Sequence, residues 1–278
     1  MIKKLLFVIL FAAVLGLPGV MAQQIKAVSF NIHNNRSASD DGPNSWYLRR
    51  KAVMSFITKE SPDVMGVQDA LLDQTSYIDN YFRKKYRRIS VGADNGITRG
   101  AHNAIYYDTA KVELIWHTTR WLSRSPRQTS ACWDDPMRHT VTIALFCDKQ
   151  TNKRFYFFNT CLSETQYYAH YESIKLLSDL VENYCKSGTP VILAGTFNVS
   201  DNDPLLEPIT GIEMVSGRRI AIRTDFRNTY NAFGKGERSM IDHFFTRNIA
   251  IDQFRTVNRN YGASYISDHY PIVIIFSL

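Results

Sequence analysis

The chain has 278 residues, of which 45% are hydrophobic and 21% charged, and its formal net charge is +7. This composition is that of a globular protein and excludes a disordered chain, a collagen-like repeat and a coiled coil. The length fits one large domain with a sizeable core. The excess of lysine and arginine favours anionic partners such as phosphate esters or nucleic acid, and it fits equally well a basic surface with no such partner.

The first 22 residues have the pattern of a secretory signal peptide. Lys3 and Lys4 precede an apolar run over residues 5–17, and small or aliphatic residues lead to a cleavage site at Ala22. We expect cleavage after Ala22, so that residues 23–278 form an exported domain that is periplasmic or secreted. The apolar run is short for a membrane span and no later segment approaches its length, so we expect no span.

Export permits disulfide bonds, and the chain has four cysteines: Cys132, Cys147, Cys161 and Cys185. Four cysteines allow three complete pairings, and their spacing does not choose among them. The chain has no Cys-x-x-Cys pair, so we expect no structural zinc site.

Apolar periodicity predicts strands interspersed with helices along the chain. In chain order, we expect a strand over 25–32, a helix over 46–58, a strand over 63–68, a helix over 71–82, strands over 103–107, 112–122, 138–146 and 155–161, a helix over 166–184, and strands over 191–194, 241–245, 251–257 and 270–276. The sequence contains no Pro/Gly/Ser-rich linker and no close repeat. The pattern therefore predicts one α/β domain in which two sheets pack together and helices cover them.

Polar residues gather at the ends of these predicted strands. They are Asn31, Gln68, Asp69, Asn159, Asn198, Asp242, Asp268 and His269. Layered folds build their sites where many strand ends meet at one rim. We therefore expect these side chains to surround one site.

The clusters belong to motifs that occur in a fixed order along the chain. The motifs are Ser-Phe-Asn31, Trp46-x-x-Arg49-Arg50, Pro62-Asp63-Val-Met-Gly-Val-Gln68, Trp121-Leu-Ser, Arg138, Asn159-Thr160, Gly195-x-Phe-Asn198, Ile241-Asp242 and Ser267-Asp268-His269-Tyr-Pro271. Together they resemble the endonuclease/exonuclease/phosphatase family, and the length and exported setting resemble its small secreted bacterial branch. The resemblance implies a four-layer α/β sandwich of two packed, mostly antiparallel sheets flanked by helices. It also implies hydrolysis of phosphate esters with Mg²⁺ or Mn²⁺.

The resemblance assigns roles to the positions that match. It implies catalytic roles for Asn198, Asp242 and His269, substrate contacts from Asn31, Arg138 and Asn159, and metal ligation by Asp69 and Asp268. The physical reason is the negative charge of a phosphate diester, which repels nucleophiles. A hard cation with oxygen ligands neutralises that charge, and positioned donors stabilise the charge that develops on the phosphoryl oxygens.

Five family positions carry a shortened or different group. Asp69 and Ala101 stand where the family has glutamate, Cys161 where it has histidine, and Ser163 and Thr196 where it has aspartate. The carboxylate of Asp69 is one methylene shorter than the family's ligand, so we expect weak binding of Mg²⁺. Thr196 is no anion near neutral pH and does not replace a general base. We therefore expect phosphoesterase activity that is weak or lost, as in a pseudoenzyme.

Two hypotheses of function remain open. One is an exported metal-dependent phosphoesterase whose site is degenerate. The other is a noncatalytic protein that binds a phosphorylated or carbohydrate ligand in the same cleft. The expected partner is a phosphate-ester small molecule or none, nucleic acid is less favoured, and a monomer is expected.

The remaining conspicuous residues are given structural interpretations. Four histidines are interpreted as surface or packing residues: His33, His117, His139 and His170. His243 is expected to point to the strand face opposite Asp242, because neighbours in a strand alternate. The basic run over residues 83–88 is interpreted as a solvated helix end, and Cys161 as an ordinary strand cysteine.

Overall fold

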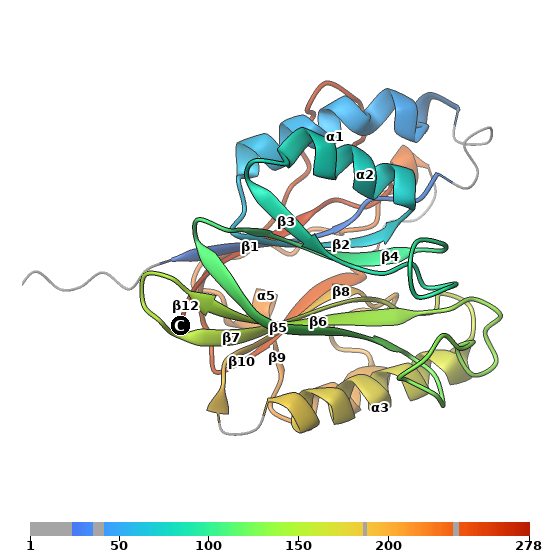
Figure 1. Ribbon diagram of the computed structural model, residues 1–278, viewed down its shortest axis with the longest axis vertical. Helices are drawn as coiled ribbons and strands as arrows, with labels where there is room; N and C mark the ends of the chain where they lie inside the picture. The colour runs from blue at the N-terminus through green and yellow to red at the C-terminus, as the bar shows by residue number, and fades with distance from the viewer. Residues whose placement is uncertain (1–23, 36–41, 186–187, 236–238) are drawn as a thin grey trace, which may run out of the picture.

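The computed structural model describes residues 24–35, 42–185, 188–235 and 239–278. The predicted signal peptide lies outside these residues. Within them the chain forms two six-stranded sheets that pack face to face, with helices on the outer faces (Figure 1). The predicted four-layer α/β sandwich is therefore confirmed.

The first sheet has the strand order β11-β12-β1-β2-β4-β3. Its strands are β1 (Ile25–Asn31), β2 (Val64–Ala70), β3 (Tyr86–Ile89), β4 (His102–Asp108), β11 (Ala250–Thr256) and β12 (Ile272–Ser277). The pair β1–β2 is parallel, and the other neighbours are antiparallel. This arrangement places the C-terminal ends of β1 and β2 side by side, with Asn31 opposite Gln68.

The second sheet has the strand order β5-β6-β7-β8-β10-β9. Its strands are β5 (Val112–Trp121), β6 (Thr140–Asp148), β7 (Arg154–Cys161), β8 (Val191–Thr196), β9 (Val215–Ser216) and β10 (Asp242–Arg247). Here β7 and β8 are the parallel pair, with Cys161 opposite Thr196, and the start of β10 lies beside them with Asp242 opposite Thr196. Both sheets are thus mostly antiparallel, and each brings the ends of its parallel strands to one rim.

Helices cover both outer faces of the sandwich. Figure 1 shows α1 (Trp46–Glu60) and α2 (Leu72–Phe82) on the first sheet and α3 (Tyr167–Tyr184) on the second. The short elements are η1 (Gly42–Asn44), η3 (Pro204–Leu206), α4 (Glu207–Thr210), α5 (Gly217–Ile220) and η4 (Ala232–Gly234). No helix in the described parts of the chain is long and apolar enough to cross a membrane.

The hydrophobic core has three parts, one beneath α1 and α2, one beneath α3, and one between the two sheets. Between the sheets, Phe146, Phe155 and Phe157 are fully buried. The alternation of β7 places the rings of Phe155 and Phe157 inward, as expected for an aromatic run in a core strand, and Phe146 joins them from β6. Burial of large aromatic side chains makes this layer the main source of apolar stabilisation between the sheets.

One polar residue ties the two sheets together inside this core. Asn159, on β7, donates to the carbonyl oxygens of Val67 at 3.0 Å and Ala104 at 2.8 Å, both in the first sheet. It also accepts from Gln68 at 2.6 Å. Gly66 leaves room for this contact, because a Cβ atom there would lie 2.5 Å from the Asn159 Oδ1 atom. The approach of the sheets near the rim thus depends on an asparagine and a glycine.

One predicted element is wrong in the first sheet. The basic run over residues 83–88 contains the start of β3 rather than only a solvated helix end, because Tyr86 and Ile89 are buried against the sheet. Arg87 and Arg88 lie between these two apolar residues and hide the strand pattern. Arg88, on β3, forms an ion pair with Asp79 of α2 at 3.0 Å.

Candidate functional site

A cavity of about 540 Å³ opens at the rim where strand ends from both sheets meet. Seven of the residues named from the sequence line it: Asn31, Asp69, Cys161, Thr196, Asn198, Asp268 and His269. Asp242 lies buried directly behind Thr196 and His269. Strand ends of both sheets therefore meet at one cavity, and the roles of these residues stay predictions.

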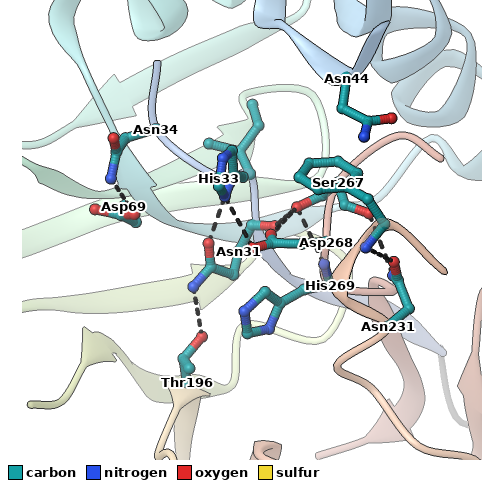
Figure 2. A network of polar contacts seen from close by, with 12 residues as sticks. Asn31, His33, Asn34, Asn44, Asp69, Thr196, Asn231, Ser267, Asp268 and His269 are labelled. Carbon is teal, nitrogen blue, oxygen red and sulfur yellow. Dashed lines mark hydrogen bonds and ion pairs between the residues drawn. The ribbon is translucent and has the colours of Figure 1, made fainter. Parts of the chain in front are cut away.

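A chain of hydrogen bonds crosses the cavity floor from the first sheet to the second. Asn31 donates to the Thr196 hydroxyl at 3.0 Å, and that hydroxyl donates to Asp242 at 2.7 Å. The other Asp242 oxygen pairs with Nδ1 of His269 at 2.8 Å. Figure 2 shows Asn31 reaching across to Thr196. The single proton of the Thr196 hydroxyl is thus donated to Asp242, and as a neutral alcohol this group is no general base near neutral pH.

The pair of Asp242 and His269 is ionised at neutral pH. Burial alone would lower the pKa of His269, but the charge of Asp242 and the hydrogen bond to it prevail and raise that pKa to about 9. Burial would raise the pKa of Asp242, and the charge of His269 outweighs this effect and holds the pKa below its usual value. His269 is therefore an imidazolium at the cavity floor, suited to stabilise negative oxygen atoms.

A second histidine–carboxylate pair forms the neighbouring wall. Nδ1 of His33 lies 2.9 Å from Asp268, and the backbone N–H of His33 donates to Asn31 at 3.1 Å. Burial would raise the pKa of Asp268, but the hydrogen bond and charges of the two neighbouring histidines lower it. The buried guanidinium of Arg49 donates to the carbonyl oxygens of residues 32, 33, 44 and 266 at 2.5–2.9 Å, which holds the segments carrying His33 and Asp268 in place.

A third pair comes from a loop of the second sheet. Nε2 of His139 lies 3.1 Å from Asp135, and its Nδ1 lies 3.0 Å from the carbonyl oxygen of Cys161. The hydrogen bond from His139 holds the pKa of Asp135 at about 2, so this carboxylate is ionised. Both ring nitrogens of His139 thus lie within hydrogen-bond distance of an oxygen atom. Ser163 stands where the family has aspartate, and its hydroxyl donates to the same Asp135 oxygen at 2.5 Å.

The shortened carboxylate of Asp69 reaches the cavity through an irregularity in β2. The register of β2 against β4 shifts between Val67 and Ala70, and Asp69 has a positive φ of 56°. Aspartate adopts this left-handed conformation more readily than most residues. Asn34 donates to the Asp69 carboxylate at 2.5 Å, as Figure 2 shows, so this side chain is held within the site.

Besides Asp242 and Ser163, three predicted positions do not line the cavity. Asn159 is completely buried between the sheets, and its amide hydrogen atoms bond to the carbonyl oxygens of Val67 and Ala104. This position supports a structural role rather than the predicted substrate contact. Arg138 does not line the cavity, and its Nη1 lies 3.9 Å from Asp94, whereas its neighbour His139 does line the cavity. Ala101 precedes β4 and also does not line the cavity.

The interpretation of His33 and His139 as surface or packing residues is wrong, because both line the cavity and bind carboxylates. His33 follows Asn31 by two residues just beyond a strand end, and that spacing was the available signal. His243 points away from Asp242, as expected, and bonds to the carbonyl oxygen of Val199 at 2.8 Å. Among the further lining residues that sequence reasoning missed are Asn34, Asp135, Glu164 and Tyr230.

All four cysteines are free. None of the three complete pairings is formed. Burial raises the pKa of Cys161 well above its ordinary value, and the neighbouring carboxylates raise it further. The Cys161 side chain is therefore a neutral thiol in the cavity wall, which is neither an activated nucleophile nor a thiolate ligand.

The fold and this cavity together define a phosphoesterase-like α/β sandwich. The sequence model of the endonuclease/exonuclease/phosphatase family matches residues 28–269, and the chain belongs to that family. The chain is similar to a family protein of Bacteroides vulgatus, with 26% identity and a TM-score of 0.85 over 92% of this chain and 99% of that one. A mannosyl-6-phosphatase of Bacteroides thetaiotaomicron has 25% identity and a TM-score of 0.85, with 91% and 100% covered.

A further relative is an uncharacterized protein, L388, of Acanthamoeba polyphaga mimivirus. It is 24% identical over 276 residues, which cover 91% of this chain and all of the viral protein. The family likeness therefore extends along the whole of the described domain rather than over a single motif.

Family members in general depend on a divalent metal, and the residues present fit such an ion poorly. Within the parts of the chain that the structure describes, no three His, Cys, Asp or Glu side chains converge as a ligand set. Asp69 is bonded to Asn34, and Asp268 is bonded to His33. Mg²⁺ and Mn²⁺ require several hard oxygen ligands at once, and Cys161 and Thr196 supply neither charge nor a free carboxylate.

Proposed function

We propose that the protein binds a small phosphate ester, carried on a sugar, in this cavity, and that it hydrolyses the ester slowly or not at all. One observation carries the proposal. The Thr196 hydroxyl donates to Asp242, while the same carboxylate keeps His269 protonated. The cavity thus retains a cationic donor for phosphoryl oxygens and lacks the carboxylate that the family has at position 196 to activate water.

The retained donors support binding of the phosphate group. His269 lines the cavity with its imidazolium ring, next to the amide side chains of Asn31 and Asn198. A charged donor contributes more to binding an oxyanion than a neutral one does. The nearly complete burial of His269 strengthens this attraction, because water screens it less than at an exposed site.

The acidic lining supports a small sugar ester rather than nucleic acid. Asp69, Asp135, Glu164 and Asp268 all line the cavity, and such a wall repels a long polyanion. Carboxylates and amides are good partners for sugar hydroxyls, because each accepts hydrogen bonds in a fixed direction. The structural relative described as a mannosyl-6-phosphatase points to the same ligand class.

The noncatalytic hypothesis differs from weak catalysis only in turnover. Both use the same ligand and the same donors, and the substitutions at Cys161 and Thr196 support either. A protein that binds sugar phosphate without releasing inorganic phosphate is a binding protein. One that releases it slowly is a weakened phosphoesterase.

Two measurements on the purified chain test the proposal. Calorimetry with mannose 6-phosphate should show binding, and His269→Ala should weaken it by at least about tenfold, as expected for loss of a charge-assisted hydrogen bond. Release of p-nitrophenol from bis-p-nitrophenyl phosphate with Mg²⁺, Mn²⁺ or Zn²⁺ should stay far below the common enzyme rate of about 10 s⁻¹. Turnover at ordinary rates contradicts the degenerate site, and absence of sugar-phosphate binding contradicts the ligand.

Weak metal binding is a separate part of the proposal. Asp69 and Asp268 are each engaged by another side chain, so a cation must displace those partners before it binds. Calorimetric titration with Mg²⁺ alone should therefore give an affinity weaker than micromolar. A micromolar affinity in the absence of substrate contradicts this reading.

We also propose that the protein is exported and cleaved after Ala22. The charged start, apolar run and small residues before Gln23 support this. Intact-mass measurement of protein recovered from the periplasm or medium should give a chain that starts at Gln23. A mass that retains residues 1–22 contradicts it.

A further inference from the structure

A second cavity lies on the outer face of the second sheet and has the opposite charge character. Its volume is about 630 Å³, and it is lined by Arg120, Pro126, Arg127, Leu180, Asn183 and Tyr184 among others. We call these six residues the arginine groove. The volume falls within the range of small-ligand sites. No acidic side chain of the described chain lines it, whereas four acidic side chains line the cavity at the rim.

The groove is distinct from the rim cavity and shares no lining residue with it. Glu164 and Thr165 touch the rim cavity just before α3 begins, and Leu180 touches the groove near the end of α3. Leu180 lies 13 residues along α3 from its first residue, Tyr167, which corresponds to about 20 Å along the helix axis. The other wall of the groove is β5, the edge strand of the second sheet, together with the loop that follows it.

The guanidinium of Arg120 is fixed in position by neutral partners. Its Nη1 donates to the Thr118 hydroxyl and to the carbonyl oxygen of Thr119 at 3.0 Å, and its Nη2 donates to the Tyr184 hydroxyl at 2.9 Å. Nε–H and one Nη2 proton have no partner among the residues that the structure describes. An arginine held in this way keeps its charge and two donors for a planar anion.

The rest of the groove provides a surface for a ring. Tyr184 packs against Trp116 with ring centroids 5.0 Å apart, which holds the Tyr184 ring beside Arg120. Pro126 and Leu180 add apolar faces, and Asn183 adds an amide. Because the Tyr184 oxygen accepts from Arg120, its own proton is available to a ligand. Aromatic and proline faces pack well against the C–H surface of a sugar.

We propose that the arginine groove is a second binding site, for a monosaccharide that carries one anionic group, either a sulfate or a carboxylate. Arg120 and Arg127 bind the anion, and the ring lies between Pro126 and Tyr184. This site is independent of the function proposed for the rim cavity, since no residue is shared between them.

The test uses the full chain and three probes in calorimetry: glucose 6-sulfate, glucuronate and glucose. At least one of the two charged sugars should bind. Glucose should bind at least about tenfold more weakly than that sugar, because it forms no charge-assisted hydrogen bonds. Added salt should weaken binding of the charged probes. If glucose binds as tightly as the charged sugars, or if neither charged sugar binds, the proposal is overturned.

Variants locate the binding. Arg127→Ala and Arg120→Ala should each weaken the charged probe at least about fivefold, and the exposed Arg127 can be replaced without disturbing the fold. Arg124→Ala is the matched control, because Arg124 is exposed in the same loop and does not line the groove. It should leave the affinity within about twofold.

A charged probe that also enters the rim cavity gives a second binding event, which Arg120→Ala and Arg127→Ala should leave in place because neither residue lines that cavity. Unchanged binding in both arginine variants overturns the assignment to the groove. A dT oligonucleotide that binds more tightly than the charged sugars, with the same dependence on Arg120 and Arg127, would show a nucleic-acid surface and would also overturn it.

Discussion

The rim cavity and the arginine groove are similar in size and differ in how their charges are used. In the rim cavity, each of the three histidines is bonded to a carboxylate, and Asp69 is bonded to Asn34. In the groove, Arg120 is held by hydroxyl and carbonyl groups alone. The difference teaches that the charged side chains of a cavity can pair with one another and stabilise the fold, or stay available to bind a ligand. The five predictions below test that division, from the largest expected effect to the smallest.

The largest effect should come from Arg49, which supports the rim cavity from behind. Arg49→Met removes donors from four backbone carbonyl oxygens in a site that is 1% exposed. Several buried acceptors then lose their partners, so we expect the free energy of unfolding to fall by about 4 kcal/mol. Urea denaturation followed by circular dichroism measures it. Arg50→Met on the same helix is the control, and an equal loss there would contradict the special role of Arg49.

Next is the recovery of catalysis in the rim cavity. The triple variant Thr196→Asp, Cys161→His and Asp69→Glu should raise Mg²⁺-dependent hydrolysis of bis-p-nitrophenyl phosphate by at least about a hundredfold, the low end for one acid–base group. Asn31, Asp242 and His269 are already positioned to support the new groups.

Single substitutions should do little in that series. Thr196→Asp alone places a second carboxylate beside Asp242, which now receives a hydrogen bond of 2.7 Å from Thr196. Groups that act as a unit are not additive, so the triple should exceed the product of the singles. A folded triple variant with no gain would mean that the substituted positions do not act together.

The third prediction concerns pH and the ion pair of His269 with Asp242. The pKa of His269 is raised from 6.5 to about 9, so its contribution to stability is complete below pH 6.5 and is lost as the pH rises toward 9. Between pH 6.5 and 8.5 the free energy of unfolding of the wild type, relative to His269→Gln, should fall by about 2 kcal/mol. Arg127→Ala in the groove should keep the wild-type pH dependence. A flat difference between wild type and His269→Gln would contradict the ion pair.

At low pH the contribution of the Asp242 carboxylate to the free energy of unfolding changes with pH in the opposite direction. The pKa of Asp242 is lowered from 3.8, so its contribution is present above pH 3.8 and is lost as the pH falls through the lowered value. The buried histidines His102, His170 and His243 have lowered pKa values and cancel when wild type and variant are compared.

A smaller effect is expected where Ser163 replaces the family's aspartate. Ser163→Asp would bring a second carboxylate against Asp135, which Ser163 now contacts at 2.5 Å. We expect a loss of about 1–2 kcal/mol in the free energy of unfolding, from like-charge repulsion and the lost hydrogen bond. Combining it with Asp135→Asn should recover most of the loss. Thermal denaturation of the single and double variants decides, and a stabilised single variant would contradict the expectation.

The smallest effect belongs to the groove. Arg127 is exposed, and Arg127→Ala should change the free energy of unfolding by less than about 0.5 kcal/mol. Denaturation of this variant beside Arg49→Met gives the contrast directly. A large loss for Arg127→Ala would mean that the groove arginines serve the fold, as the charges of the rim cavity do.

Much of the fold follows from the sequence because strand and helix periods are local signals. The strands β1, β2 and β7 each appear in the sequence as apolar runs that stop near Asn31, Gln68 and Asn159. β3 escaped because two arginines stand between its buried residues Tyr86 and Ile89. The motifs of the family supplied the layering, which periodicity alone does not give.

The pairings inside the site could not be predicted, because they join segments distant in the chain. Asn31 meets Thr196 across the two sheets, and His33 meets Asp268 from opposite ends of the sequence. Periodicity shows that a side chain faces inward, but not which residue of the other sheet it meets. Asn159 illustrates this limit, since its motif pointed to the ligand while its position is inside the core.

The place of β12 in the first sheet has a consequence for synthesis. β12 lies between β11 and β1, and the loop that carries Asp268 and His269 comes directly before it. A nascent chain that has released β1 must therefore wait about 240 residues for its neighbour on that side. At about 5–20 residues per second this delay lasts roughly ten seconds or more. Until Ser277 emerges, the strand edge of β1 is unpaired and the cavity has no imidazolium at its floor, so ligand binding reports completed translation of the domain.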